Sequence, residues 1–148
     1  MAEAMRNTPE LRETSDFSAM LNLARESGLD SDHLTGIVGA YGFFLDGKMV
    51  GCAALKSGDN LLMVECLAVV ESMRGRGLGR TLVAHIEKVA KANGAKKLWA
   101  IARQPRFFER IGYRISTAID QGAPKNEDCM TCSQFGKSCW PAIVVKDL

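Results

Sequence analysis

The sequence predicts a mixed α/β domain, in which helices pack on a mostly antiparallel sheet that contains one parallel pair of strands. Three strand patterns follow one another between residues 41 and 70, separated by short turns, which favours an antiparallel meander. An amphipathic helix pattern at 78–91 and a strand pattern at 97–102 come next. Strand, helix and strand in this order require a right-handed crossover, which makes the two strands parallel.

Length and composition favour a single domain over residues 1–148 with an ordinary core, because 47% of the residues are hydrophobic and 24% are charged. A net charge of +2 gives no overall electrostatic case for nucleic acid or a membrane surface as partner. No apolar run approaches the roughly 20 residues that span a bilayer. Five cysteines are an odd number, and Cys52 and Cys66 lie in strand patterns, so we expect a cytoplasmic protein without a disulfide framework.

The N-terminal third predicts two helices and a short edge strand. We expect residues 1–9 to be loosely ordered and the strand to start at 10–12. A helix pattern covers 16–27, with Ser15 or Asp16 as N-cap and an apolar side made of Phe17, Met20, Leu21 and Ala24. A second, shorter helix is expected at 31–38, before Gly39.

The middle of the chain predicts the meander itself. The strand pattern at 41–45 ends in an Asp46-Gly47 hairpin turn, and 48–56 forms the next strand. The third strand, 61–70, is apolar almost throughout, which is typical of a central strand covered on both faces.

The C-terminal part predicts shorter elements. A short helix at 105–110 starts with proline, and a strand follows at 113–116. Residues 120–148 are expected to form a cysteine-containing tail that closes with a short strand at 142–145.

A glycine- and arginine-rich segment, residues 74–80, joins the central strand to the long helix. Glycines let the backbone approach a ligand, and the free N–H groups of a first helical turn bind phosphate. A nucleotide-triphosphate loop is excluded because no lysine follows Gly79, and a dinucleotide fingerprint lacks its third glycine. The remaining alternative is a turn with solubilising arginines.

The pattern Arg74-x-x-Gly77-x-Gly79 after a strand resembles the acyl-CoA-binding signature of the GNAT superfamily of N-acetyltransferases. Residues 107–113 and 46–53 resemble two further segments of that family, and the order of elements agrees over about residues 10–116. Within the family, these three segments together most resemble those of the short amino-acid, glutamate-type acetyltransferases.

This resemblance implies acetyl-CoA as cosubstrate, held between the fourth and fifth strands. It implies that Val69 donates its backbone N–H to the developing oxyanion and that Phe108 packs beside the acetyl group. The residues that it implies for binding the pantetheine and the pyrophosphate are Leu67, Ala68, Val69, Arg74, Gly75, Arg76, Gly77, Gly79 and Arg80.

Glu65 is the candidate general base, because the amine must lose a proton before it attacks. It is the only carboxylate in the 61–70 strand, and the alternation of a regular strand places it on the same face as Leu67. Many family members carry a glutamate here. The alternative is a structural glutamate in an ion pair.

The other polar candidates are a general acid and two arginines that could bind the acceptor. Family members that use a general acid have a tyrosine at the position of Phe108, so the acid is either Tyr113 or solvent. Arg103 and Arg106 are candidates for binding an acceptor carboxylate, with ordinary surface charge as the alternative.

The tail contains Cys129, Cys132 and Cys139, with the Cys-x-x-Cys spacing of metal and redox sites. Zinc usually takes four protein ligands in structural sites, and a fourth is missing here, so we expect no metal. Zinc, a redox role and packed free thiols remain alternatives.

Together these observations predict an N-acetyltransferase that moves an acetyl group from acetyl-CoA to a primary amine of a small molecule, with amino acids as the first candidates. The alternatives are a protein N-acetyltransferase, a non-catalytic acyl-CoA sensor and a redox or metal module built on the tail. A homodimer is a further expectation for the assembly.

Overall fold

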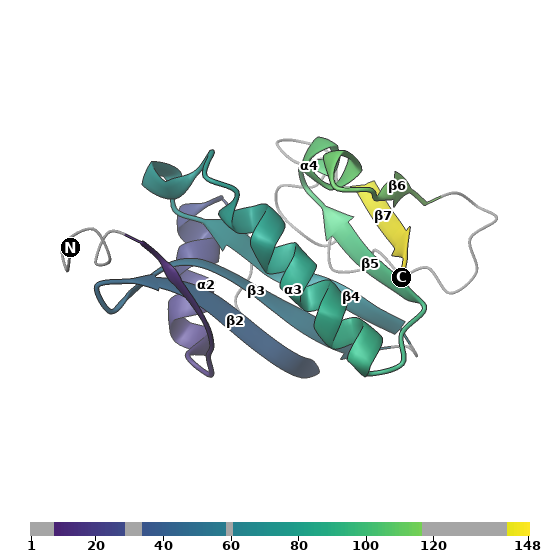
Figure 1. Ribbon diagram of the computed structural model, residues 1–148, viewed down its shortest axis with the longest axis horizontal. Helices are drawn as coiled ribbons and strands as arrows, with labels where there is room; N and C mark the ends of the chain where they lie inside the picture. The colour runs from purple at the N-terminus through teal and green to yellow at the C-terminus, as the bar shows by residue number, and fades with distance from the viewer. Residues whose placement is uncertain (1–7, 29–33, 59–60, 117–141) are drawn as a thin grey trace.

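The computed structural model describes residues 8–28, 34–58, 61–116 and 142–148. These residues form one seven-stranded sheet in the order β1-β2-β3-β4-β5-β7-β6. All neighbouring strands are antiparallel except β4 and β5, which are parallel. Helix α3 crosses one face of the sheet and α2 covers the other (Figure 1). The predicted fold class is therefore confirmed.

The first edge of the sheet is as expected, with β1 (Glu10–Glu13) beside β2 (Ile37–Leu45). Helix α2 (Phe17–Glu26) begins after Asp16, whose side chain accepts a hydrogen bond from the Ala19 N–H at 3.1 Å. Its buried side is made of Met20, Leu23 and Ala24. The prediction was wrong for Phe17, which is 36% exposed in the first turn, and for Leu21, which is only half-buried.

The second helix predicted at 31–38 is wrong for its described part. Residues 34–36 are not helical, and β2 already starts at Ile37. Gly36 has a φ of +68°, a left-handed value that ends any right-handed helix. Its carbonyl accepts the Ser57 N–H at 2.8 Å, which ties this stretch to the end of β3. Residues 29–33 lie outside the described part.

The meander follows the prediction, with β3 (Lys48–Gly58) between β2 and β4 (Leu61–Val69). Asp46 and Gly47 have φ values of +51° and +78°, as a type I′ hairpin turn requires. β4 is a central strand with buried residues on both faces.

A short 3-10 helix, η1 (Glu71–Met73), leads from β4 to α3 (Leu78–Ala92). β5 (Lys97–Ala102) returns parallel to β4, and α4 (Pro105–Arg110) follows. The last elements are β6 (Arg114–Ile115) and β7 (Ala142–Asp147), and β7 inserts between β5 and β6. The predicted tail before β7 lies outside the described residues.

Two layers of core define the two faces of the sheet. On what we call the α3 face, Leu82, Val83 and Ile86 of α3 are fully buried against the sheet. On the α2 face, Met20 and Ala24 of α2 are fully buried against small residues of β3 and β4. A strand residue that joins one of these two clusters can therefore be assigned to a face of the sheet.

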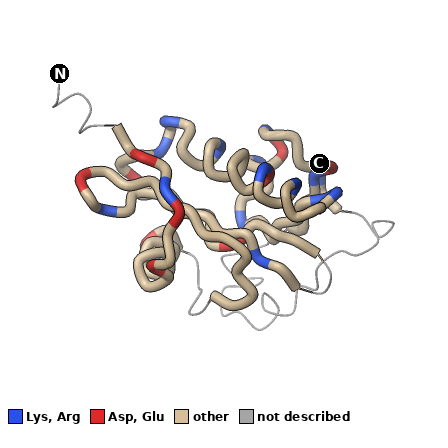
Figure 2. Tube along the Cα trace, turned by 60° about the horizontal axis from the view of Figure 1, so that its bottom comes forward, with Lys and Arg blue, Asp and Glu red and all other residues tan. Residues whose placement is uncertain are grey.

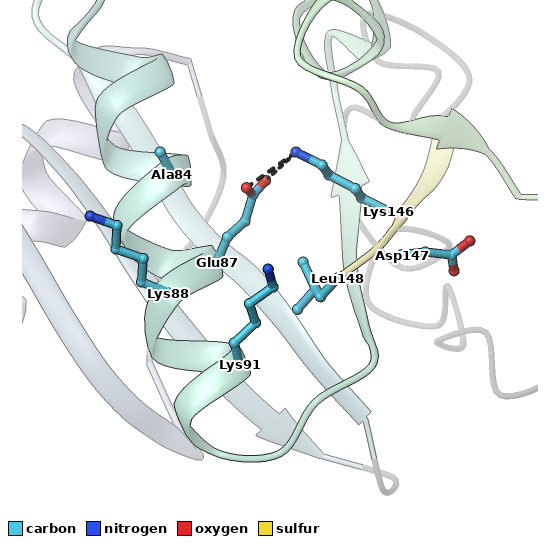
Figure 3. A pocket seen from close by; sticks show the side chains of 7 residues that line it. All are labelled: Ala84, Glu87, Lys88, Lys91, Lys146, Asp147 and Leu148. Carbon is cyan, nitrogen blue, oxygen red and sulfur yellow. Dashed lines mark hydrogen bonds and ion pairs between the residues drawn. The ribbon is translucent and has the colours of Figure 1, made fainter.

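A polar network links the long helix to β7. The Tyr113 hydroxyl donates to Glu87 Oε2 at 2.7 Å, and Lys146 Nζ lies 3.2 and 3.3 Å from the two oxygens of the same carboxylate. Burial, followed by the hydrogen bond to Glu87, raises the pKa of Tyr113 well above its usual range. Figure 3 shows Glu87 and Lys146 pointing toward each other across a shallow pocket, which is lined by Ala84, Glu87, Lys88, Lys91, Lys146, Asp147 and Leu148.

We predict that Tyr113→Phe destabilises the protein by about 1–3 kcal/mol, because it removes a partly buried hydrogen bond to a carboxylate that is also paired with Lys146. Urea denaturation at neutral pH measures the change. Lys88→Ala is the matched control, since Lys88 is exposed on the same helix and its loss should change stability by less than about 0.5 kcal/mol. Equal stability of Tyr113→Phe and the wild type would show that the network contributes nothing.

Candidate functional site

Strand β4 contains a bulge at Cys66. Glu65 pairs with Ala54 and Ala68 pairs with Cys52, so two residues of β4 stand opposite Ala53 alone. Cys66 has a φ of +56°, which is uncommon for a residue with a side chain and typical of the first residue of a glycine-type bulge. The extra residue turns the strand partway along its length.

The bulge corrects the expected placement of Glu65. Glu65 pairs with Ala54, which belongs to the α2-face cluster, and directly paired residues point to the same side of a sheet. Leu67 instead packs on the α3 face. Glu65 and Leu67 therefore lie on opposite faces, because the prediction assumed a regular alternation that Cys66 interrupts. Glu65 is half-buried there.

The same strand has an open edge toward β5. Pairing between β4 and β5 covers Met63 with Trp99 and Val64 with Ala100, and the two strands separate beyond that point (Figure 1). The Val70 N–H donates to Val50 of β3 at 2.9 Å. Because backbone groups alternate between the two edges of a strand, the Val69 N–H and carbonyl point toward β5. The end of β4 thus presents backbone polar groups to a gap in the sheet.

Arg74 ties the following loop to that edge. Its Nε donates to the Val69 carbonyl at 3.0 Å, which satisfies an acceptor that the separated β5 does not reach. Nε of Arg74 is thus used in a backbone contact. The sequence placed Arg74 among the phosphate-binding residues, and the structure adds this second contact.

The loop itself is shaped for a close approach to its backbone. Gly75 and Gly77 have φ values of +78° and +80°, and a Cβ at either position would meet no atom within 4 Å. Gly77 is the N-cap of α3 and offers no side chain to the N–H groups of Leu78, Gly79 and Arg80. Figure 2 shows basic residues at this loop and along α3. The start of α3 therefore has the open backbone and the positive charge that suit the binding of an anion.

Phe107 is a residue of this site that the sequence reasoning missed. A Cβ on Gly79 would lie 3.3 Å from the Phe107 ring, so α4 packs directly on the start of α3. Phe108, the expected neighbour of the acetyl group, is 6% exposed and packs in the α3-face core, with its ring centroid 5.2 Å from that of Phe107. The signal in the sequence was the pair of neighbouring aromatic residues, because adjacent residues of a helix point in different directions. Phe107 therefore contacts Gly79, whereas Phe108 packs in the core.

The two candidate acceptor arginines have different surroundings. Arg103 directly follows β5, and its guanidinium donates to the Gly28 carbonyl just beyond α2. Arg106 is exposed on α4, beside Glu109 and Arg110. Arg103 therefore reaches toward the end of α2, and Arg106 does not share that environment.

The metal and membrane expectations are only partly covered by the structure. Cys129, Cys132 and Cys139 lie outside the described residues. Within the described ranges, no group of three or more His, Cys, Asp or Glu side chains is arranged to hold a metal ion. None of the helices in this described part is long and apolar enough to cross a membrane.

The site is thus a bulged strand with an open edge, followed by a glycine–arginine loop and a helix. Comparison of the sequence with known protein families leads to the same region. The sequence model of the acetyltransferase (GNAT) family matches residues 2–113. The chain belongs to the GNAT acetyltransferase family. The matched range includes β4, the loop and α4.

Individual relatives are more distant. The chain is 33% identical over 69 residues to an uncharacterized N-acetyltransferase of Chlorobaculum tepidum, a match that covers 46% of this chain and 44% of that protein. The chain thus matches less than half the length of this curated relative.

Solved GNAT structures share the fold. N-acetylglutamate synthase from Neisseria gonorrhoeae, complexed with coenzyme A and N-acetyl-glutamate, aligns with a TM-score of 0.74 at 23% identity, over 95% of this chain and 35% of that one. A GNAT family acetyltransferase from Elizabethkingia anophelis with acetyl-CoA bound aligns with a TM-score of 0.69 at 17% identity, over 96% and 99%.

We predict that Gly77→Ala weakens binding of coenzyme A, measured by calorimetry, because a side chain intrudes where the loop backbone meets the ligand. Gly47→Ala is the matched control, since Gly47 has nearly the same φ and the same open surroundings in the β2–β3 hairpin. Both variants should lose about 1–2 kcal/mol of stability through the left-handed backbone. Unchanged affinity in Gly77→Ala would remove the loop from the binding site.

Proposed function

We propose that this protein transfers an acetyl group from acetyl-CoA to a primary amine of a small molecule. The observation that carries the proposal is the open edge of β4, where backbone donors of a bulged strand lie next to a glycine-rich helix N-terminus. Membership of the GNAT family supports the same reaction class. Acetyl-CoA supplies the acetyl group as an activated thioester.

The loop and the strand edge bind different parts of this cosubstrate. The N–H groups of Leu78 to Arg80 and the arginine side chains hold the pyrophosphate, in the open space beside Gly75 and Gly77. The backbone of residues 67–69 holds the pantetheine arm, and the Val69 N–H donates to the thioester oxygen as negative charge develops on it.

Glu65 acts as the general base from the α2 face. The bulge points Glu65 to the face opposite Leu67, so the amine approaches from the side that α2 covers. A half-buried carboxylate accepts the ammonium proton directly or through a water, and the neutral amine then attacks. The C–S bond then breaks and the coenzyme A thiolate leaves to take a proton from solvent, because the Tyr113 hydroxyl donates to Glu87 and Phe108 has no proton to give.

An amino acid is the acceptor that the site supports best. Arg103 approaches the α2 end of the molecule through Gly28, and a guanidinium matches an acceptor carboxylate. N-acetylglutamate synthase, which shares the fold, was solved with N-acetyl-glutamate. Because that similarity is one of fold alone, the proposal of an amino-acid acceptor depends on Arg103.

Release of free coenzyme A thiol across a panel of amino acids, polyamines and lysine peptides tests the proposal. We expect turnover with small amines, and with amino acids above all. Turnover with peptides alone would instead make the protein a protein acetyltransferase. Tight acetyl-CoA binding without turnover on any amine would make it a sensor.

We predict that Glu65→Gln lowers kcat/KM at neutral pH by about 100-fold or more, the usual contribution of a general base. The dissociation constant for acetyl-CoA should stay the same, because the Glu65 side chain points to the α2 face, whereas the cosubstrate binds to the backbone of residues 67–69 and to the loop. The variant should also lose the rise of kcat/KM with pH that deprotonation of the base produces. An unchanged pH–rate profile would exclude Glu65 as the base.

We predict that Arg103→Gln reduces kcat/KM for an amino acid much more than for the same molecule without its carboxylate. Comparing the two substrates cancels any loss that comes from loosening the end of α2. Arg106→Gln is the matched control and should change neither value, because its side chain is exposed on α4. An equal loss on both substrates would assign Arg103 a structural role only.

A further inference from the structure

Two buried thiols lie side by side under the β4 bulge, and the proposed acetyl transfer uses neither. Cys52 of β3 has no exposed surface, and Cys66 of β4 is 7% exposed. Cys52 Sγ lies 3.3 Å from the Cys66 carbonyl oxygen. Both sulfurs also contact the Met20 carbonyl oxygen of α2, at 4.0 and 3.6 Å.

The bulge is what brings the two thiols together. In a regular strand Cys66 would lie on the face opposite Glu65. With the extra residue both lie on the α2 face, which is also the face of Cys52. Cys52 pairs with Ala68, and Cys66 lies in the bulge next to that pair. Both sulfurs contact the same carbonyl oxygen, that of Met20, so the two thiols share one small site between β3, β4 and α2.

The pair is also chemically unequal. The close contact with Cys52 lowers the pKa of Cys66, whereas the contact with Cys66, followed by burial, raises the pKa of Cys52. The thiolate is the reactive form of cysteine, and Cys66 retains the little exposure that the pair has. We therefore expect an oxidant to react first with the Cys66 sulfur. Cys52 is the neighbouring thiol that can then attack the oxidised sulfur.

We propose that Cys52 and Cys66 are an oxidation site, at which a peroxide converts the two thiols into a reversible intramolecular disulfide. The Cys66 thiolate attacks a peroxide oxygen, so that an S–O bond forms, the O–O bond breaks and hydroxide leaves. The Cys52 sulfur then attacks the Cys66 sulfur, the S–S bond forms, and the oxygen leaves as water. Two thiols are oxidised and one hydrogen peroxide is reduced to two waters.

The disulfide acts on the edge of β4. Cys66 is followed directly by residues 67–69, whose backbone faces the gap toward β5. Drawing the Cys66 sulfur to bonding distance of Cys52 pulls the bulge toward β3 and displaces that edge. The oxidised protein should therefore bind acetyl-CoA more weakly, a consequence that rests on the proposed function, whereas the disulfide itself does not.

Peptide mapping tests the site directly on the full chain. The protein is treated with hydrogen peroxide, its remaining thiols are alkylated, and it is digested with trypsin without reduction. Cys52 and Cys66 fall in separate peptides, Met49–Lys56 and Ser57–Arg74, and the tail cysteines fall in others. We expect the first two peptides to appear linked, with the mass of their sum less two hydrogens, and to separate on adding dithiothreitol.

Three outcomes would overturn the proposal: oxidation of Cys66 to sulfinic acid without a link, a link from Cys66 to a tail cysteine, or two unreacted thiols. Cys52→Ala provides the second test, because without its partner Cys66 should accumulate as a sulfenic acid that dimedone traps. A linked but fully active protein would leave the disulfide in place and remove only its effect on acetyl-CoA binding.

Discussion

The bulge at Cys66 is the constraint on which the rest of the site depends. One extra residue in β4 assigns Glu65 and Leu67 to opposite faces of the sheet, and a left-handed backbone at a non-glycine residue is uncommon enough to need support. That support comes from both sides, because Val64 is held on the α3 face before the bulge and Ala68 on the α2 face after it. A strand without the bulge would place Glu65 and Leu67 on the same face.

The second half of the site is an electrostatic arrangement that needs little side-chain chemistry. Two left-handed glycines expose the backbone where α3 begins, and Arg74 fixes that loop to the last carbonyl of β4. In the proposed function, cofactor binding therefore relies on backbone geometry, whereas proton transfer relies on the Glu65 side chain on the α2 face. Phe107 holds α4 against Gly79 and so keeps the loop and the following helix in one unit.

The sequence was sufficient for the fold and the loop, because both depend on local patterns. Helix periodicity, the Asp46-Gly47 turn and the strand–helix–strand order indicated the sheet correctly. The bulge could not be predicted, since nothing in an apolar run shows which residue will be the extra one, and the face of Glu65 was wrong for that reason. The helix expected at 31–38 failed because a left-handed Gly36 and pairing with β3 outweigh local helix propensity.

The central claim is that acetyl-CoA binds along the edge of β4 and the start of α3. Backbone NMR of the nitrogen-labelled protein, titrated with acetyl-CoA, tests it most directly. The account predicts that the amide signals of residues 67–69 and 78–80 shift most, while that of Trp99, in the paired part of β5, stays in place. Shifts confined to Lys88, Lys91 and Leu148, around the pocket of Figure 3, would contradict it.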